Sequence, residues 1–151
     1  MMLRLSRKTL LALEAVIDIA FNARPEPVQA KEITARQGVP QRYLEQVMQQ
    51  LVRAGVLKGV RGPRGGYRLA RERRRISVGD VVRVAESIED GEEEKVRPRS
   101  ELGVRIVAPL IQKLQDGIMT ELDSISIEDL CQRARAHGVD IAGGASTDFA
   151  I

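Results

Sequence analysis

Two sets of side chains in the first half of this 151-residue chain have the chemistry needed to contact nucleic acid. The first set is Gln41, Arg42, Glu45 and Gln46, whose spacing places them together on one face of a helix. Such side chains can hydrogen-bond the edges of adenine, guanine and cytosine. The second set is a glycine loop with arginines, made of Arg61, Gly62, Pro63, Arg64, Gly65, Gly66 and Tyr67. Because glycine lets the backbone approach a phosphate closely and arginine fits a narrow minor groove, the two sets predict binding to double-stranded DNA.

The distribution of charge supports the same hypothesis. Residues 1–80 hold 16 Lys/Arg and 7 Asp/Glu, a net charge of +9, whereas residues 81–151 hold 8 and 14, a net charge of −6. A basic half provides sequence-independent affinity for DNA through counterion release. The acidic half therefore has a different role.

Other classes of function are disfavoured by what the chain lacks. It has a single cysteine, Cys131, and a single histidine, His137, so most triads and histidine metal sites cannot be assembled and an enzyme is not expected. One cysteine also excludes an internal disulfide framework and suits a reducing cytoplasm. The N-terminal segment is amphipathic, unlike a signal peptide, and no apolar run approaches a membrane span, so we expect a cytoplasmic protein with no membrane partner.

Hydrophobic spacing predicts three helices and a hairpin before residue 80. The first helix covers about 6–21, with Leu10, Leu13 and Ile17 in its repeat, and the second covers 28–37. The third, about 41–54, has the buried-stripe pattern of Leu44, Val47, Met48, Leu51 and Val52. Two extended runs, 56–61 and 67–70, flank the glycine loop. Three helices followed by a glycine-rich hairpin are typical of a winged helix-turn-helix.

The second half predicts a helix that pairs with another helix. A fourth helix begins at Ser77, and a charged linker follows at 88–101. The next helix, about 102–125, is kinked or begins at Pro109. Its seam of apolar residues is spaced like that of a helix pair and consists of Val104, Val107, Ile111, Leu114, Ile118 and Leu122. We therefore expect a mainly α fold with a small β-hairpin wing, divided into a DNA-binding domain (1–87), the linker, a dimerisation helix with a short final helix (102–137) and a flexible tail (138–151).

Three stretches resemble a known family. They are Tyr43-Leu44-Glu45-Gln46, residues 51–57 and residues 60–70 with their Arg-Gly-Pro-Arg-Gly-Gly-Tyr motif. They resemble the IscR-type regulators, also called the Rrf-two family, over about residues 3–137. The resemblance implies a homodimeric bacterial transcription regulator whose long helix crosses that of its partner. It maps the family's recognition helix onto Gln41, Arg42, Tyr43, Glu45 and Gln46, and its wing onto residues 61–67.

The chemistry of these residues suggests individual roles. Glu45 can accept from N4 of cytosine, Gln46 can pair with adenine, and Arg61 can enter the minor groove. The resemblance implies that Tyr43 reaches the phosphate backbone, and the alternative is that it packs against the wing. Because the two half-sites are read by a dimer, we expect a near-palindromic operator.

The chain departs from the family at the iron–sulfur cluster. Many members hold a [2Fe–2S] cluster with three cysteines before the long helix, but this chain has neither cysteine nor histidine between residues 88 and 109. We therefore expect no cofactor and no metal. Residues 92–94, three glutamates, are more typical of a solvated loop than of a cation site, and Cys131 of a buried structural thiol than of a redox sensor. His137 suits the C-terminal end of a helix.

Two questions stay open from the sequence. Members of the family without a cluster include regulators of cysteine and sulfur metabolism that respond to a cysteine-synthase partner, and such a protein is one candidate effector. A small ligand at the junction of linker and long helix is another, and constitutive binding is a third. The alternative function is a protein-interaction module in which the winged domain binds an acidic protein, although the polar face at 41–53 favours a repressor that binds DNA.

Overall fold

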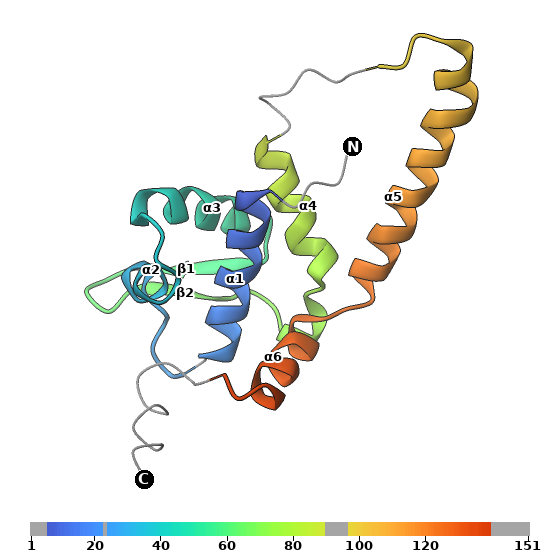
Figure 1. Ribbon diagram of the computed structural model, residues 1–151. Helices are drawn as coiled ribbons and strands as arrows, with labels where there is room; N and C mark the ends of the chain where they lie inside the picture. Colours follow the sequence, from blue (N-terminus) through green and yellow to red (C-terminus); the bar gives the residue numbers. More distant parts are fainter. Residues whose placement is uncertain (1–5, 23, 90–96, 140–151) are drawn as a thin grey trace.

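The computed structural model describes residues 6–22, 24–89 and 97–139, and these form a mainly helical fold with one antiparallel hairpin (Figure 1). Its elements are α1 (Arg7–Phe21), α2 (Ala30–Gln37), α3 (Gln41–Arg53), β1 (Leu57–Val60), β2 (Gly66–Leu69), a 3-10 turn (Arg73–Arg75), α4 (Val78–Glu89), a π-helical segment (Gly103–Val107), α5 (Ala108–Asp123) and α6 (Ile127–Ala136). Residues 90–96 of the predicted linker and 140–151 of the predicted tail lie outside the described residues, and the linker begins later than predicted because Ile88 and Glu89 belong to α4. In the part of the chain that is described, no helix has the length and apolar character needed to cross a membrane.

Serine caps begin three of the helices as the sequence predicted. The Ser6 hydroxyl accepts a hydrogen bond from the amide of Thr9 at 3.2 Å. Ser77 and Asp80 form a reciprocal capping box at the start of α4, with distances of 2.9 and 3.0 Å. Ser126 and Asp129 form another at the start of α6. Each cap satisfies backbone N–H groups that have no partner within the helix.

The core confirms the predicted stripe of α3 but not the predicted repeat of α1. Leu44, Val47, Met48 and Leu51 are all buried on α3. In α1, however, the buried face is made mostly of Leu11, Ala12, Ala15, Val16 and Ile19, and Leu10 is 50% exposed. The expectation for Leu10 was therefore wrong. Because α1 lies between several elements, its small alanines face the core and allow close helix packing.

The second helix begins two residues later than predicted. Val28 is not helical, but pairs with Tyr67 of β2 through two backbone hydrogen bonds of 3.0 and 2.7 Å. Its side chain is buried in the core. The segment before α2 thus runs beside the hairpin as a third, short extended piece, which local hydrophobic spacing does not reveal.

Pro109 is accommodated by a change of helix type. The chain is π-helical over Gly103–Val107 and becomes α-helical at Ala108, whose amide bonds the carbonyl of Gly103. Proline has no N–H and crowds the carbonyl four residues before it. A wider turn immediately before Pro109 removes that conflict, so the helical rod continues through the proline.

The last helix packs on the winged domain. Ile127 and Cys131 of α6 are fully buried in the same core as α1 and α3. The sequence had grouped this helix with the dimerisation helix in residues 102–137. In the structure, α5 leans away from the other elements, whereas α6 returns beneath α1 (Figure 1).

Candidate nucleic-acid interface

The first half of α3 presents polar side chains to solvent above its buried stripe. Gln41, Arg42 and Gln46 are exposed, and Glu45 is half-buried. The Gln41 amide donates a hydrogen bond of 2.9 Å to the Glu45 carboxylate, one helical turn away. Further along the same face lie Gln49 and Arg53, so the exposed face of α3 consists of groups that can read base edges and contains no exposed aliphatic or aromatic side chain.

α3 and β2 each carry one tyrosine that packs on the hydrophobic core. Tyr43 and Tyr67 are both half-buried and pack against the hydrophobic core. Burial raises the pKa of the Tyr67 hydroxyl, and the nearby negative charge of Glu45 raises it further. Tyr67 at the base of the wing therefore lies within the electrostatic influence of Glu45 on α3.

The wing loop between β1 and β2 needs its glycines. Gly62 has a φ of 116°, a conformation that side chains rarely adopt. A Cβ at Gly65 would lie 2.9 Å from the Gly62 carbonyl oxygen, and a Cβ at Gly66 would lie 2.7 Å from the carbonyl carbon of Val28. Arg61, Pro63 and Arg64 are exposed on this tight loop. The backbone packing therefore presents two arginines at the tip.

A segment with two prolines, residues 24–28, holds the wing in place, although hydrophobic spacing indicates only the boundary between the first two helices there. The Arg68 guanidinium on β2 donates to the carbonyls of Arg24 and Pro25. Together with the pairing of Val28 and Tyr67, these bonds attach the hairpin to residues 24–28. One feature of the sequence could have indicated this attachment. Val28 is an apolar residue beside prolines in a segment that otherwise has the composition of a loop.

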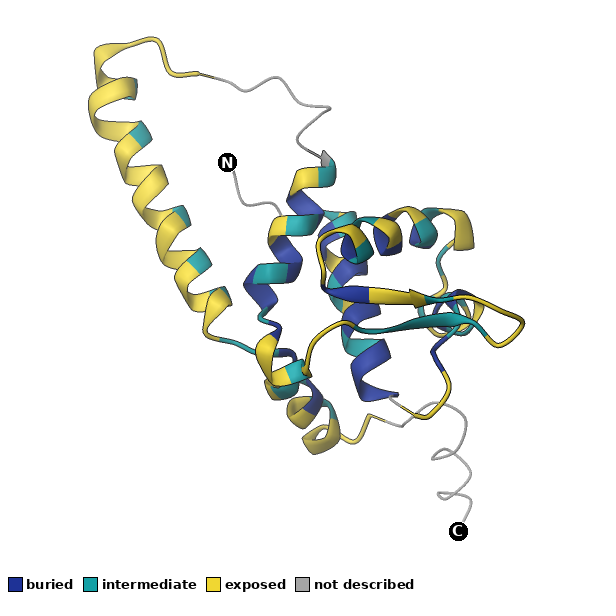
Figure 2. Ribbon diagram, turned by 180° about the vertical axis from the view of Figure 1, so that it is seen from behind, coloured by how far each residue is buried: buried dark blue, intermediate teal, exposed yellow. Residues whose placement is uncertain are grey.

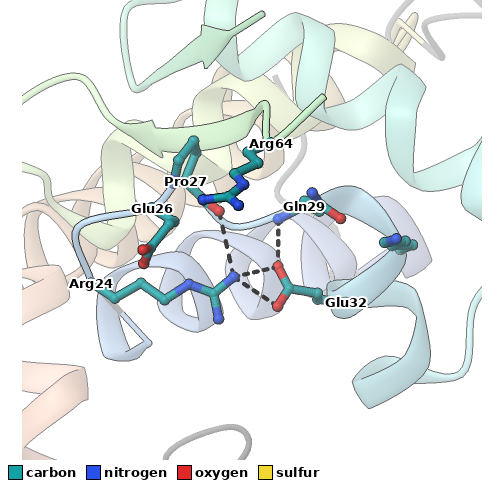
Figure 3. Close-up of a pocket in the computed structure, with 7 residues that line it drawn as sticks. Arg24, Glu26, Pro27, Gln29, Glu32 and Arg64 are labelled. Atoms are coloured by element: carbon teal, nitrogen blue, oxygen red, sulfur yellow. Dashed lines mark hydrogen bonds and ion pairs between the residues drawn. The ribbon is translucent and has the colours of Figure 1, made fainter. Parts of the chain in front are cut away.

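An open pocket lies between this segment, the start of α2 and the wing tip (Figure 3). The Arg24 guanidinium contacts both carboxylate oxygens of Glu32 at 2.7 Å, and Glu32 also accepts from the backbone N–H of Gln29 at 2.8 Å. Partial burial by itself would raise the pKa of Glu32, but the bond from Arg24 leaves that pKa below its ordinary value. Five of the seven lining residues are charged, and the lining consists of Arg24, Glu26, Pro27, Gln29, Lys31, Glu32 and Arg64. The pocket is thus a charged hollow of mixed sign beside the wing, with Arg64 of the wing tip on its rim.

The start of α3, α2 and the wing loop lie on one side of the molecule, and α5 lies on the other (Figures 1 and 2). The structure therefore brings the two sets of predicted contact residues to a common side. A helix with a polar exposed face beside an arginine-tipped loop is the arrangement expected of a winged helix-turn-helix, whose recognition helix enters the major groove.

The predicted seam of α5 and the preceding π-helical segment is exposed in the single chain (Figure 2). Ile111 is 43% and Leu114 is 54% exposed. Val104, Val107 and Ile118 are exposed to a similar degree, whereas Leu122 is half-buried. A continuous apolar face of this length is uncommon on a monomer and marks an interaction surface.

The residues present do not fit a cluster held by cysteines. Cys131 is the sole cysteine of the chain, it is fully buried on α6, and burial raises the pKa of its thiol. A thiolate ligand is disfavoured there. Among the described residues, no group of three His, Cys, Asp or Glu side chains lies close enough to hold a metal ion. The glutamates at 92–94 lie outside those residues.

Comparison with known proteins agrees with this architecture. A family model described as Rrf2, iron-dependent transcriptional regulator, matches residues 5–133. The transcriptional regulator IscR of Photorhabdus laumondii is 33% identical over 147 residues, covering 97% of this chain and 88% of its own. Among solved structures, IscR of T. potens has a TM-score of 0.72 at 34% identity, covering 91% of this chain and 93% of its own. CymR, described as the global cysteine regulator of B. subtilis, has a TM-score of 0.70 at 32% identity, covering 87% and 98%.

These similarities extend over the winged domain, the long helix and most of the final helix, and they hold in sequence and in fold alike. The family consists of transcriptional regulators and not of enzymes. The chain belongs to the Rrf2 family of DNA-binding transcriptional regulators.

Proposed function

We propose that this regulator is a homodimeric repressor that works in the cytoplasm and binds a near-palindromic operator. The observation that supports this best is the common side shared by the α3 face and the wing, with an unpartnered apolar helix on the other side. In this proposal Gln41, Arg42, Glu45 and Gln46 read base edges, and residues 61–67 contact the minor groove and the phosphates. The seam from Val104 to Ile118 pairs with a second copy.

Selection from a random-sequence pool of DNA duplexes tests this proposal. The full chain should enrich two inverted half-sites whose centres are about one helical turn, or a multiple of it, apart. Enrichment of a single half-site would contradict the dimer. If the selection enriches no sequence at all, the protein does not recognise a specific operator. Placing the selected operator over a promoter then distinguishes a repressor from an activator.

Replacing Arg61 with alanine is expected to weaken DNA binding and to reduce its dependence on salt. An arginine in the minor groove releases counterions, so its loss should lower the slope of log affinity against log salt by about one. Titrations at several salt concentrations measure this slope. Arg135, which is exposed on α6, provides the matched control, because its replacement by alanine removes the same charge far from the wing. Equal slopes for the two variants would count against the wing contact.

We also propose that the protein binds DNA without an iron–sulfur cluster, on the evidence of the single buried thiol. Protein purified without oxygen should show no visible absorbance band and should bind the selected operator fully. A cluster spectrum, or DNA binding that requires added iron, would contradict this.

The effector belongs, in our proposal, to cysteine or sulfur metabolism, and a cysteine-synthase-type protein is the first candidate partner. The similarity to CymR, a protein described as a cysteine regulator, supports it. Operator affinity measured alone, with a cysteine synthase and with small sulfur metabolites distinguishes a protein partner from a small ligand. Affinity unchanged by either addition would indicate constitutive binding.

A further inference from the structure

The end of α5 is attached to the start of α4 by backbone pairing. The amide of Val78 donates to the carbonyl of Ile125, and the amide of Ile127 donates to the carbonyl of Ile76, both at 2.8 Å. Ile76 and Ile127 are fully buried. Residues 76–80 and 123–127, which we call the α4–α5 joint, thus form a short antiparallel bridge at the edge of the core.

Side chains close the same joint. Gly79 is buried, and a Cβ at this position would overlap the Asp123 carboxylate and lie 2.9 Å from its Cγ. The Arg83 guanidinium bonds that carboxylate at 2.5 Å and lies 3.7 Å from Asp80. The hydrogen bond from Arg83 holds the pKa of Asp123 below its ordinary value. The last turn of α5 therefore contacts the first turn of α4 at a position where any side chain larger than glycine's would have to displace the Asp123 carboxylate.

The joint is also linked to the wing. The chain leaves β2 at Leu69 and reaches Ile76 through the 3-10 turn. Within this connection, Arg73 forms an ion pair with Glu128 of α6 and donates to the Ala20 carbonyl of α1 at 3.4 Å. Arg71 lies 3.7 Å from Asp80. The same few residues thus connect the DNA-contacting hairpin, the core and the base of α5.

From this arrangement we infer that the α4–α5 joint sets the direction of α5 relative to α3 and thereby the spacing of the two half-sites that the dimer reads. The inference rests on the homodimer proposed above. Beyond the joint, α5 is exposed along most of its length (Figure 2), so its direction depends on its attached end.

A small rotation of α5 at the α4–α5 joint produces a large displacement of its opposite end. A helix of 16 residues is about 24 Å long at 1.5 Å per residue, so a tilt of about 10° at one end moves the other end by about 4 Å. Successive base pairs are about 3.4 Å apart along DNA. A tilt of this size, caused by a substitution at Gly79 or Asp123, would therefore move the far end of α5 by about the rise of one base pair.

The first test measures distances between protomers in the absence of DNA. A nitroxide attached to a Gln49→Cys variant, on the exposed face of α3, reports the distance between the two recognition helices of a dimer. The native Cys131 is buried, and protein without the new cysteine shows whether it takes up label. We expect Gly79→Ala and Asp123→Asn to shift or broaden this distance by about 4 Å, the displacement of the helix end.

Asp116→Asn is the matched control. Asp116 is also an exposed carboxylate on α5, but it bonds Gln112 of the same helix and not the joint. It should leave the distance unchanged. Asp123→Asn keeps the test decisive if the alanine at Gly79 prevents folding, because the Asp123 side chain is 43% exposed.

The second test repeats the random-duplex selection with each variant. Half-site sequences should stay those of the wild type, whereas the spacing between half-sites should change or become less uniform for Asp123→Asn. A dimer with the same distance and the same spacing in both joint variants would overturn the inference and leave the proposed function intact. If the labelled Gln49→Cys protein without a joint substitution shows no distance between two nitroxides, the proposed dimer itself is contradicted.

Discussion

Replacing Ile111 and Leu114 together with aspartate is expected to convert the protein to monomers and to lower its operator affinity about a hundredfold or more. Both side chains lie on the exposed apolar face of α5. An aspartate buried in a paired seam loses its hydration without gaining a partner. In the dimer, binding of one subunit holds the second subunit at a high effective concentration beside its half-site. Separate subunits lose this advantage, so the expected loss in affinity does not require any contact between α5 and DNA.

Light scattering gives the mass of the variant, and binding to a full operator and to a single half-site gives its affinity. Affinity for the single half-site should match that of the wild type, because α5 is remote from the α3 face. The control variant carries the same two aspartates at Gln112 and Thr120, exposed polar positions of α5, and should stay dimeric. A seam variant with unchanged mass and affinity would refute the pairing of α5.

Replacing Gln46 with alanine is expected to abolish the preference for one base at one position of each half-site. The Gln46 amide is exposed on α3 and can hydrogen-bond two groups on adenine at once. Its loss should reduce discrimination at that position by about 1–3 kcal/mol, which is about 5- to 150-fold in relative affinity. Competition binding against operators that carry each of the four base pairs at each position measures this.

Gln49 provides the matched control for this experiment, since it is an exposed glutamine on the same helix about one turn further from its N-terminal end. Its replacement by alanine should leave preference at the Gln46 position unaltered. If Gln46→Ala weakens binding equally for every sequence, the side chain contacts phosphate instead of a base.

Glu45 illustrates a limit of reading this interface from residue types. The sequence placed its carboxylate on the reading face, where it can accept from cytosine. The structure adds that the Gln41 side-chain amide already donates a hydrogen bond to it. A base contact by Glu45 therefore has to compete with the bond from Gln41, which sequence spacing alone does not indicate.

Local patterns predicted the elements that depend on local interactions. The stripe on α3, the serine caps and the glycine wing follow from spacing and backbone chemistry within a few residues, and all were found. The errors arose where distant segments meet. Leu10 is exposed because its neighbours, and not its own repeat, determine which face of α1 is covered. Val28 is extended because β2 offers it backbone partners from 39 residues away.

The position of α6 has a consequence for how the chain is made. Ile127 and Cys131 complete a core whose first members, Leu11 and Val16, lie more than 100 residues earlier. Contacts of such long sequence separation form slowly, because the entropy of closing a large loop is lost before the contacts can stabilise the chain. During synthesis, α5 with its apolar face therefore leaves the ribosome before the core can close. A nascent chain halted between α5 and α6 would expose apolar side chains of the incomplete core together with the apolar face of α5. Exposed hydrophobic surface of this kind is what chaperones bind.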